Sequence, residues 1–368
     1  MTAKVRVSNL QVFMAVMATV IAYGHFVYVG LSFEAAGRDS WFSMVVGFAL
    51  SAVLFYFRVK QASLHPNESL IQYTLSVFGT WVGGVVGSLY IAYFLVVGAF
   101  TLKELSSFLG LIYPTTPYQV FVAMELLLIG WVVRAGGEVV TRVIQLLLPV
   151  LVFMGILASL FSMKDKDPTK LLPVLDHSVL QLSHGALMYL AIFCELIVFS
   201  MFWQDAKELD KAPKQTWLAT VVLFLMFLGP ATGPIMVFGE RLCQILPYPT
   251  YSEIQYIRLT GIFERMDVVG VLLWAMGSYI RVSVFVLGAT RGIAHLVGSQ
   301  NENLYVLPVT IVLGGVTVSL ISTSRELMHQ FLFTTYPFIA LAVGAGFPLL
   351  TAAVALFRRN RKTQVQPS

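Results

Sequence analysis

The sequence predicts an all-α integral membrane protein, a bundle of about ten transmembrane helices. Of the 368 residues, 57% are hydrophobic and only 12% are charged, whereas about a quarter of the residues of a soluble domain are charged. The mean hydropathy is +0.79. The apolar residues fall in runs of about 20, the length that crosses a bilayer as a helix. We therefore expect one polytopic transmembrane domain, residues 1–363, followed by a short cytoplasmic tail, 364–368.

Ten apolar runs are the candidate spans. The first run is too long for the 7–15-residue apolar region of a secretory signal and leads to Glu34 instead of a small-residue cleavage site, so we expect it to be a retained span. The fourth run is short, and GPATGP at 229–234 interrupts the seventh. The runs are 9–32, 40–59, 82–107, 118–134, 140–163, 183–203, 215–239, 267–297, 304–322 and 335–357.

The segment between the second and third runs, NESLIQYTLSVFGTWVG at 67–83, is too polar at its start to insert. Its apolar residues are spaced as on one face of a helix, which predicts a helix lying in the membrane interface.

Ten spans suit a 5+5 inverted repeat, a transporter-like bundle whose ligand site lies near the bilayer midplane where helices break. The first span carries such a break signal, because IAYGHFVYVG places Gly24 and Gly30 among aromatic and β-branched residues. The matching sixth span, SHGALMYLAIFCELIVFSMFW, holds Glu195 in its interior, but its break is less obvious.

The distribution of Lys and Arg predicts that both chain ends are cytoplasmic. With an inside N-terminus, 14 of the 24 basic residues fall in inner segments and 8 in outer segments, and Lys103 and Arg281 lie within spans. Cytoplasmic loops carry the excess of positive charge. The lysines of KDKDPTK at 164–170 run against this orientation.

A few ionisable residues lie inside the predicted spans. An arginine at a membrane centre costs about 2.5–3.5 kcal/mol on insertion scales, and its guanidinium cannot lose its proton. The alternatives for each residue are a functional site, a structural ion pair or a side chain that reaches to the interface. Glu195 and Arg281 are central, which favours function; Lys103 and Glu104 lie near a helix end, which favours structure. The others are Glu125 and His25.

Catalysis, a metal and a cofactor are not expected. The sequence has no HExxH, GxSxG, P-loop or GxGD motif, and its six histidines show no metal-ligand spacing on one helix face. Cys194 and Cys243 imply no disulfide framework. The basic residues gather at helix ends and form no nucleic-acid-binding patch.

Four stretches resemble one family, the B subunits of spore germinant receptors. They are the Ser-x-x-Gln opening and glycine-containing first span in VSNLQVFMAVMATVIAYG; the FGTWVG core at 78–83; the Gly-x-Glu-x-x-x-Arg turn at 136–142; and YPT at 248–250 with FERMD at 263–267 before a tryptophan-bearing span. The resemblance covers nearly the whole chain.

This resemblance implies the amino acid–polyamine–organocation transporter fold and a nutrient-sensing subunit in the inner membrane of the spore. Its partners would be an A subunit, a C lipoprotein, the lipid bilayer and a small nutrient, commonly an amino acid. The pocket implied by the family is formed by spans one, three, six and eight. Its residues here would be Ala22, Tyr23, Gly24, Tyr93, Val97, Phe193, Glu195, Ser278 and Arg281.

Two departures from the family pattern lie in the first span: Tyr28-Val29 replaces a Leu-Pro pair, and Ala22 replaces a glycine. Three functions therefore stay open. In the first, the chain is a ligand-gated sensor in which Arg281 pairs with Glu195 or with an acidic group of the nutrient. In the second, it is a proton-coupled transporter of amino acids or similar solutes. In the third, it is a scaffold whose site has decayed.

Overall fold

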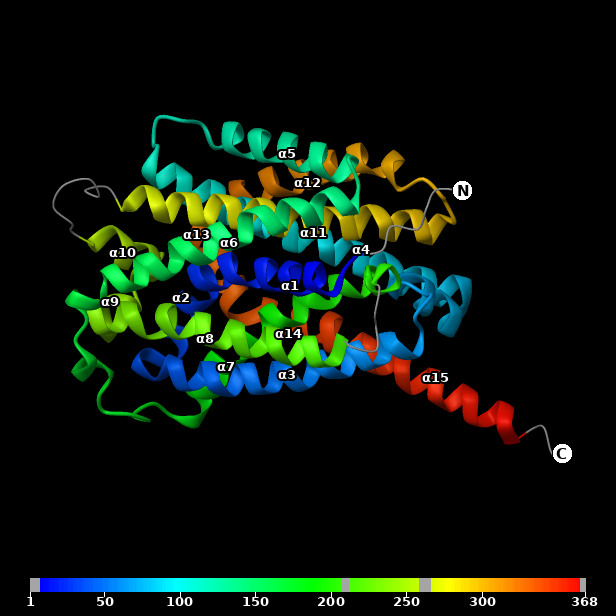
Figure 1. Cartoon of the computed structure of the whole chain (residues 1–368), viewed down its shortest axis with the longest axis horizontal. Coiled ribbons are helices and arrows are strands. Elements are labelled where there is room, and N and C mark those ends of the chain that lie inside the picture. The colour runs from blue at the N-terminus through cyan, green and yellow to red at the C-terminus, as the bar shows by residue number, and fades with distance from the viewer. Residues whose placement is uncertain (1–6, 207–211, 258–265, 365–368) are drawn as a thin grey trace.

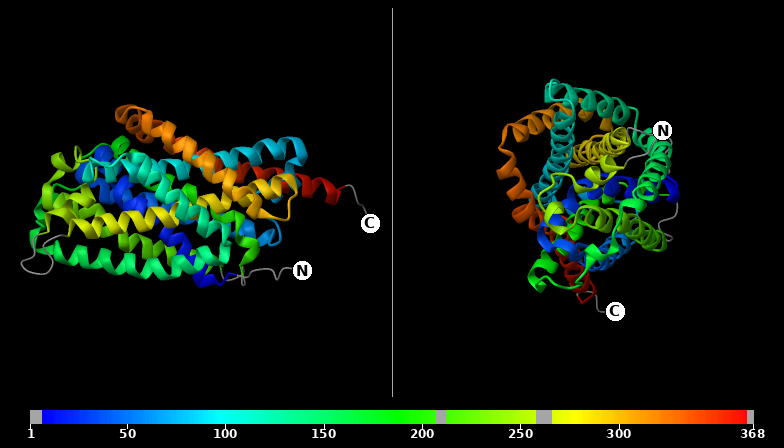
Figure 2. Two further views of the ribbon diagram at one scale, coloured as in Figure 1. Left: turned by 90° about the horizontal axis from the view of Figure 1, so that it is seen from above. Right: turned by 90° about the vertical axis from the view of Figure 1, so that its left-hand side faces the viewer.

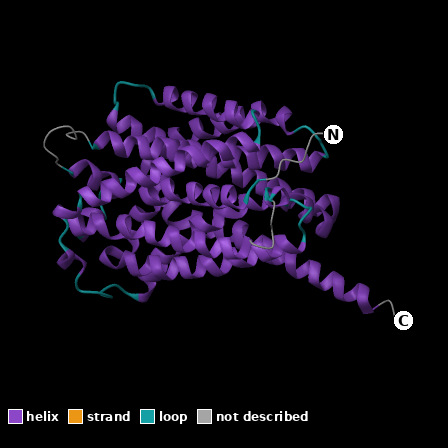
Figure 3. Cartoon of the chain, in the orientation of Figure 1, coloured by secondary structure: helices purple, strands orange, loops and turns teal. Residues whose placement is uncertain are grey.

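The computed structural model describes residues 7–206, 212–257 and 266–364, and within these ranges the chain is almost wholly helical, without a named strand (Figure 3). Long helices run side by side along an elongated bundle (Figure 1), and the end-on view in Figure 2 shows the helices of both halves of the chain around a shared centre.

The first half of the chain supplies five predicted spans, of which the first is broken by a π-helical stretch. Its elements are α1 (Asn9–Tyr23), η1 (Gly24–Tyr28), α2 (Val29–Ala36), η2 (Gly37–Asp39), α3 (Ser40–Leu64), α4 (Leu70–Ile112), α5 (Tyr118–Arg134), α6 (Gly137–Phe161), η3 (Met163–Asp165) and η4 (Pro168–Leu171).

The second half supplies the other five. The sixth span ends in a 3-10 stretch, one π-helical stretch leads into the tenth span and a second lies within it. The elements of this half are α7 (Val179–Cys194), η5 (Glu195–Met201), η6 (Trp203–Asp205), α8 (Ala212–Phe238), α9 (Glu240–Cys243), α10 (Pro249–Tyr256), α11 (Asp267–Val297), η8 (Glu302–Tyr305), α12 (Val306–Ser322), α13 (Arg325–Gln330), η9 (Phe331–Thr335), α14 (Tyr336–Leu341), η10 (Ala342–Gly346) and α15 (Phe347–Gln364).

Each of the ten predicted ranges is occupied by helix, and the all-α membrane class is confirmed. Eight helical stretches of the described chain are long and apolar enough to cross a bilayer. One of them, Asn9–Ala62, contains both the first and the second predicted spans, and α5 has only 17 residues. The count of ten spans therefore stays a prediction, as do the single-domain boundaries. The predicted tail, 364–368, lies almost entirely outside the described residues.

Three helices begin with the same local motif. In SNLQ, SLIQ and SVLQ the serine hydroxyl accepts a hydrogen bond from the backbone of the glutamine, and the glutamine side chain accepts one from the serine backbone. This reciprocal capping box satisfies backbone N–H groups that a helix start leaves unpaired. It fixes the starts of α1, α4 and α7.

The predicted interfacial helix is the first part of α4. Gly79 has φ 80° and ψ 177°, so the chain changes direction there. Glycine is the residue that adopts a positive φ without strain. A Cβ atom at Gly83 would lie 2.8 Å from Leu75 Cα, so the two parts of α4 pack backbone against backbone. The FGTWVG motif is thus a turn motif.

The expected interruption of the seventh span is wrong, since α8 continues through Pro230 and Pro234. Transmembrane helices tolerate proline because neighbouring groups satisfy the freed backbone. Gly233 in this motif has a packing role, because a Cβ atom there would lie 2.5 Å from Oε2 of Glu253 in α10.

The centre of the bundle is built by the broken spans and by α4 and α11. Helix α11 packs against α4, α1 and α6, while α3 packs against α7 and α8. In the stretch Asn9–Ala62, 78% of the most apolar window is buried within the protein, against 22% in the α6 and α12 stretches. The latter helices therefore present apolar side chains to the lipid.

Candidate ligand site

Two of the central spans break at equivalent places. Helix α1 runs 15 residues from its capping box before the π-helical η1, and α7 runs 16 residues from its own before the 3-10 stretch η5. Glu195, predicted to lie inside the sixth span, is the first residue of that stretch. A change of helix type leaves carbonyl groups without their usual partners, and π-bulges are frequent at functional sites. The two breaks define the candidate site.

Arg281 of α11 lies at the junction of these breaks, with 1% of its surface exposed. Its three nitrogens each donate to a different element. Nε donates to Thr101 Oγ1 at 3.0 Å and one terminal nitrogen to the Thr19 carbonyl at 2.8 Å. The other terminal nitrogen makes an ion pair with Glu195. The guanidinium therefore joins spans one, three, six and eight.

Glu195 is held from both sides. One carboxylate oxygen meets Arg281, and the other accepts hydrogen bonds from the hydroxyls of Tyr28, at 2.8 Å, and Tyr336. Isolated buried charges are costly, and removal of one partner leaves the other uncompensated. The two tyrosines and the arginine together satisfy this carboxylate, which the expectation of an Arg281–Glu195 pair did not include.

Three predicted residues of spans one and eight meet closely at the α1–α11 contact. The Tyr23 ring lies 4.6 Å from the Arg281 guanidinium carbon, a cation–π distance. A Cβ atom at Gly277 would lie 2.0 Å from the Cβ atom of Ala22. Gly277 is thus required because the methyl group of Ala22 fills this contact.

The remaining predicted residues surround this contact and are all buried. Tyr93 lies close enough to Glu195 and Tyr336 for electrostatic interaction. The Val97 carbonyl accepts from the Thr101 hydroxyl, and a Cβ atom at Gly24 would lie 2.4 Å from the Phe227 ring. The nine residues expected from the resemblance are thus buried together in one region of the bundle: Ala22, Tyr23, Gly24, Tyr93, Val97, Phe193, Glu195, Ser278 and Arg281.

Three hydroxyls of the nine predicted residues make no hydrogen bond within the described chain, those of Tyr23, Tyr93 and Ser278. All three residues are buried, at 2%, 4% and 0% exposure. Buried polar groups are nearly always paired with protein or with ordered water. These three hydroxyls are therefore available to a bound molecule or to water.

The sequence analysis did not predict a second buried arginine, Arg58 of α3, because it counted this residue among the basic residues of the inner segments. Arg58 is 4% exposed. It donates to the Phe193 carbonyl at 3.2 Å and to the Gly344 carbonyl, where α7 gives way to η5 and where η10 bulges. Its position near the end of an apolar run concealed this role. Tyr28, Thr101 and Tyr336 were missed because hydroxyl residues in a span carry no distinctive signal.

Lys103 and Glu104 form an ion pair with each other at 2.7 Å, as the structural alternative expects, near the C-terminal end of the third predicted span. The Tyr248 hydroxyl donates to the second oxygen of Glu104 at 3.2 Å. Burial and the neighbouring Glu104 raise the pKa of Tyr248 well above its usual value, so the phenol keeps its proton. His25 and Glu125 belong neither to the Arg281–Glu195 network nor to the Lys103–Glu104 pair. His25 Nε2 and Glu125 Oε2 have no hydrogen-bond partner among the described residues.

Metal-ligand clusters of three or more His, Cys, Asp or Glu residues do not occur in the described chain. The arrangement of charges and hydroxyls is that of a binding or switching site. It offers a fixed positive charge, a compensating carboxylate and unpaired hydroxyls between helices that are already broken.

Comparison with known proteins places this chain in one family. Residues 6–326 match the spore permease family, described as spore germination protein. Spore germination protein KB of Bacillus subtilis (strain 168) is 24% identical over 98% of this chain and 97% of its own. Spore germination protein XB of Bacillus anthracis is 24% identical over 76% of this chain and 79% of its own.

Solved structures with the same fold are transporters. Mhp1, a nucleobase-cation-symport-1 family transporter with bromovinylhydantoin bound, is similar with a TM-score of 0.71 and 12% identity, over 94% of this chain and 79% of its own. MhsT in complex with L-phenylalanine gives a TM-score of 0.67 and 12% identity, over 94% and 90%. At this identity the likeness concerns the fold, and it confirms the transporter-like bundle. Together with the match over residues 6–326, the motifs and the relatives establish that this chain belongs to the spore germination protein family, among its germinant-receptor B subunits.

Proposed function

We propose that this chain is the nutrient-sensing subunit of a spore germinant receptor. A small nutrient, an amino acid in the first instance, binds near the middle of the bundle and shifts a conformational equilibrium. The A subunit and the C lipoprotein in the inner spore membrane receive that shift. Both chain ends are cytoplasmic in this arrangement.

The observation that carries the proposal is the Arg281–Glu195 pair at two helix breaks, with unpaired hydroxyls beside it. A ligand shifts an equilibrium only by its differential affinity for the two states. A ligand carboxylate that competes with Glu195 for Arg281 supplies that difference, because the pair ties α11 to the broken sixth span. A bidentate Arg–carboxylate contact also gives orientation.

Germination of spores that carry Arg281→Ala tests the proposal. We expect the nutrient response to fall by at least about tenfold while the protein stays in the membrane, because the variant keeps the apolar face of α11. The double variant Arg281→Ala/Glu195→Gln removes the unpaired carboxylate, and it controls for misfolding. A normal nutrient response at normal protein levels in both variants contradicts the proposal.

A proton-coupled secondary transporter is the second candidate. The similarity in fold to two transporters, and the contact of Arg281 with the Thr19 carbonyl in the last half of α1, favour it. Uptake into proteoliposomes distinguishes the two. Binding of a nutrient without accumulation supports the sensor, whereas accumulation driven by a proton gradient supports the transporter.

A further inference from the structure

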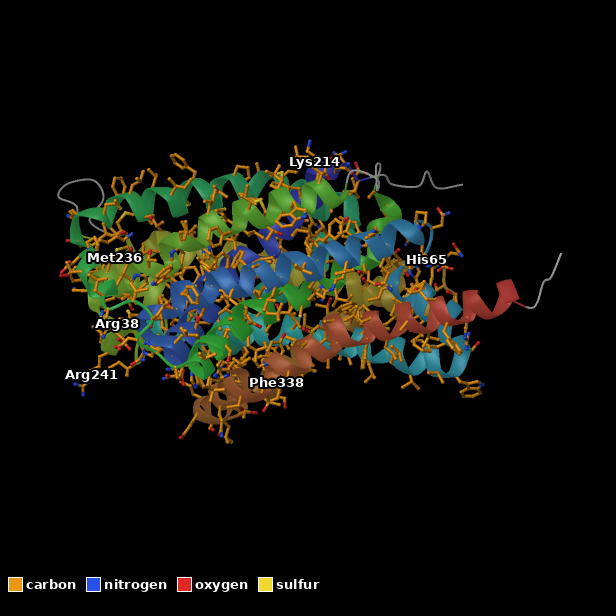
Figure 4. The ribbon with its side chains drawn as sticks, turned by 90° about the horizontal axis from the view of Figure 1, so that it is seen from below. Arg38, His65, Lys214, Met236, Arg241 and Phe338 are labelled. Carbon is orange, nitrogen blue, oxygen red and sulfur yellow. The ribbon has the colours of Figure 1, made fainter. Side chains whose placement is uncertain are left out.

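A second polar region lies away from the nine predicted residues, at the end of the bundle where α2, α13 and the loop before α10 meet. It is a cavity of about 570 Å³, within the size range of roughly 300–1,000 Å³ that is usual for small-molecule sites. None of the nine predicted residues lines it. In the predicted orientation it opens on the outer side of the membrane, from which a nutrient arrives. Figure 4 labels Arg38 and Arg241 at this end of the bundle and His65 and Lys214 toward the other.

The cavity lining carries charges of both signs in nearly equal number. Three carboxylates and three basic groups line it: Glu34, Glu104, Glu326, Lys103, Arg325 and His329. An anion site has an excess of positive groups, and a polyamine site an excess of negative groups. A balanced lining suits a molecule that carries both charges.

Two pairs on this lining neutralise each other. Lys103 Nζ lies 2.7 Å from Glu104, and both side chains are largely buried, at 7% and 11% exposure. His329 Nε2 lies 2.9 Å from Glu34. The Lys103 ammonium has three N–H donors, of which the hydrogen bond to Glu104 uses one. This lysine therefore keeps donors for a ligand carboxylate.

Arg325 and Glu326 are exposed at the cavity and make no ion pair with any described residue. They are consecutive at the start of α13. The Arg325 guanidinium offers two parallel N–H donors for a carboxylate, and the Glu326 carboxylate offers an acceptor for an ammonium group.

Apart from Gln244 and Tyr248, the rest of the wall is apolar, and it includes branched side chains from three separate segments: Leu31, Ile245, Leu246 and Leu332. We infer that this cavity binds a free α-amino acid with an apolar side chain, whose charged groups meet the basic and acidic residues and whose side chain lies on the branched wall. This inference rests on the proposed function and names its ligand class and a binding subsite outside the predicted pocket.

An aromatic layer separates this subsite from Arg281. The Tyr248 ring packs against Trp274 at 4.7 Å, and Trp274 stacks on Phe26 of η1 at 4.8 Å. Trp274 precedes Arg281 by seven residues of α11, about 10 Å along the helix axis. Since Tyr248 also binds Glu104, an amino acid that contacts Glu104 is coupled through Tyr248 to Trp274 and to the broken first span.

Binding to the purified full-length chain in nanodiscs tests the inference. The probes are L-leucine, 3-methylbutylamine, which lacks the carboxylate, and 4-methylpentanoate, which lacks the ammonium group. We expect leucine to bind at least about tenfold more tightly than either analogue, because each loses one charge-assisted contact. Equal affinity of the three probes, or no leucine binding to the wild-type chain, overturns the zwitterion assignment. The germination test of Arg281→Ala is independent of either result.

Two cavity variants and one control variant test where the ligand binds. Arg325→Gln is expected to weaken leucine binding about tenfold and to leave 3-methylbutylamine unaffected, and Glu326→Gln is expected to spare 4-methylpentanoate instead. Arg241→Gln is the matched control, an exposed residue at the same end that does not line the cavity. Leucine binding that survives both cavity variants overturns this location while leaving the proposed nutrient-sensing function intact.

Discussion

The centre of the bundle and the end that carries the cavity contain the same kinds of side chain in different settings. The predicted orientation places the cavity end on the outer side of the membrane, and it is called the outer end. At the centre, Arg281 and Glu195 are each 1% exposed and fully engaged by hydroxyl and carbonyl groups. At the outer end, the Lys103–Glu104 pair borders a cavity, and the neighbouring Arg325 and Glu326 are exposed. The difference teaches that a charge in this membrane protein has two uses. The central pair holds helices together, and we expect the pair beside the cavity to exchange partners with a ligand.

The largest expected effect is that of Glu195→Gln. The substitution keeps the size of the side chain and an acceptor for Tyr28 and Tyr336, but it leaves the Arg281 charge uncompensated. We expect a loss of about 3–5 kcal/mol in stability, measured by chemical denaturation in detergent micelles. Arg281→Met on the same background should restore part of it. A loss below 1 kcal/mol would erase the contrast between the centre and the outer end.

Arg58 is a second buried charge. It tests whether a buried charge also stabilises the protein away from the Arg281–Glu195 pair. Arg58→Met leaves the Phe193 and Gly344 carbonyls without this donor. We expect a loss of about 1–3 kcal/mol, seen as a lower midpoint of thermal unfolding. Lys60→Met, two residues along and exposed, is the matched control. Equal midpoints for the two variants would show that the carbonyl contacts contribute nothing.

The tight contact between α1 and α11 gives a smaller and reversible effect. Gly277→Ala places a methyl group 2.0 Å from that of Ala22, and overpacking typically costs about 1–3 kcal/mol. Ala22→Gly added to Gly277→Ala removes the clash and should recover most of the stability. If the double variant is no more stable than the single one, Ala22 is not the residue that requires Gly277.

The smallest effect is expected at the outer end. Glu104→Gln keeps an acceptor for the Tyr248 hydroxyl and leaves Lys103 beside a cavity that admits water. We expect a stability loss of about 1 kcal/mol or less, because this pair, although largely buried, borders the cavity. The loss is measured under the same denaturing conditions as that of Glu195→Gln. A loss as large as that of Glu195→Gln would place Lys103 and Glu104 with the structural pairs instead.

Much of the fold could be predicted from local patterns. All ten predicted runs coincide with helix in the described chain, and the glycine at position 24 marked the break in the first span. The break in the sixth span carried no such signal, because Cys194 and Glu195 are ordinary helix residues. The prolines of α8 led to the wrong prediction that the seventh span is interrupted. A helix surrounded by protein and lipid continues through proline where a helix in water would end.

The sequence by itself determined that Arg281 needs a partner, because a guanidinium keeps its charge and a membrane interior penalises it. Only the tertiary structure decided that the partner is Glu195 and not Glu104 or Glu125, and that Tyr28 and Tyr336 complete the network. It also decided that Arg58 is buried and that Arg325 lies at a cavity with Lys103. Apolar periodicity is a property of neighbouring residues along one chain segment. Partnership depends on which segments meet across the bundle, over separations of 86 residues for Arg281 and Glu195.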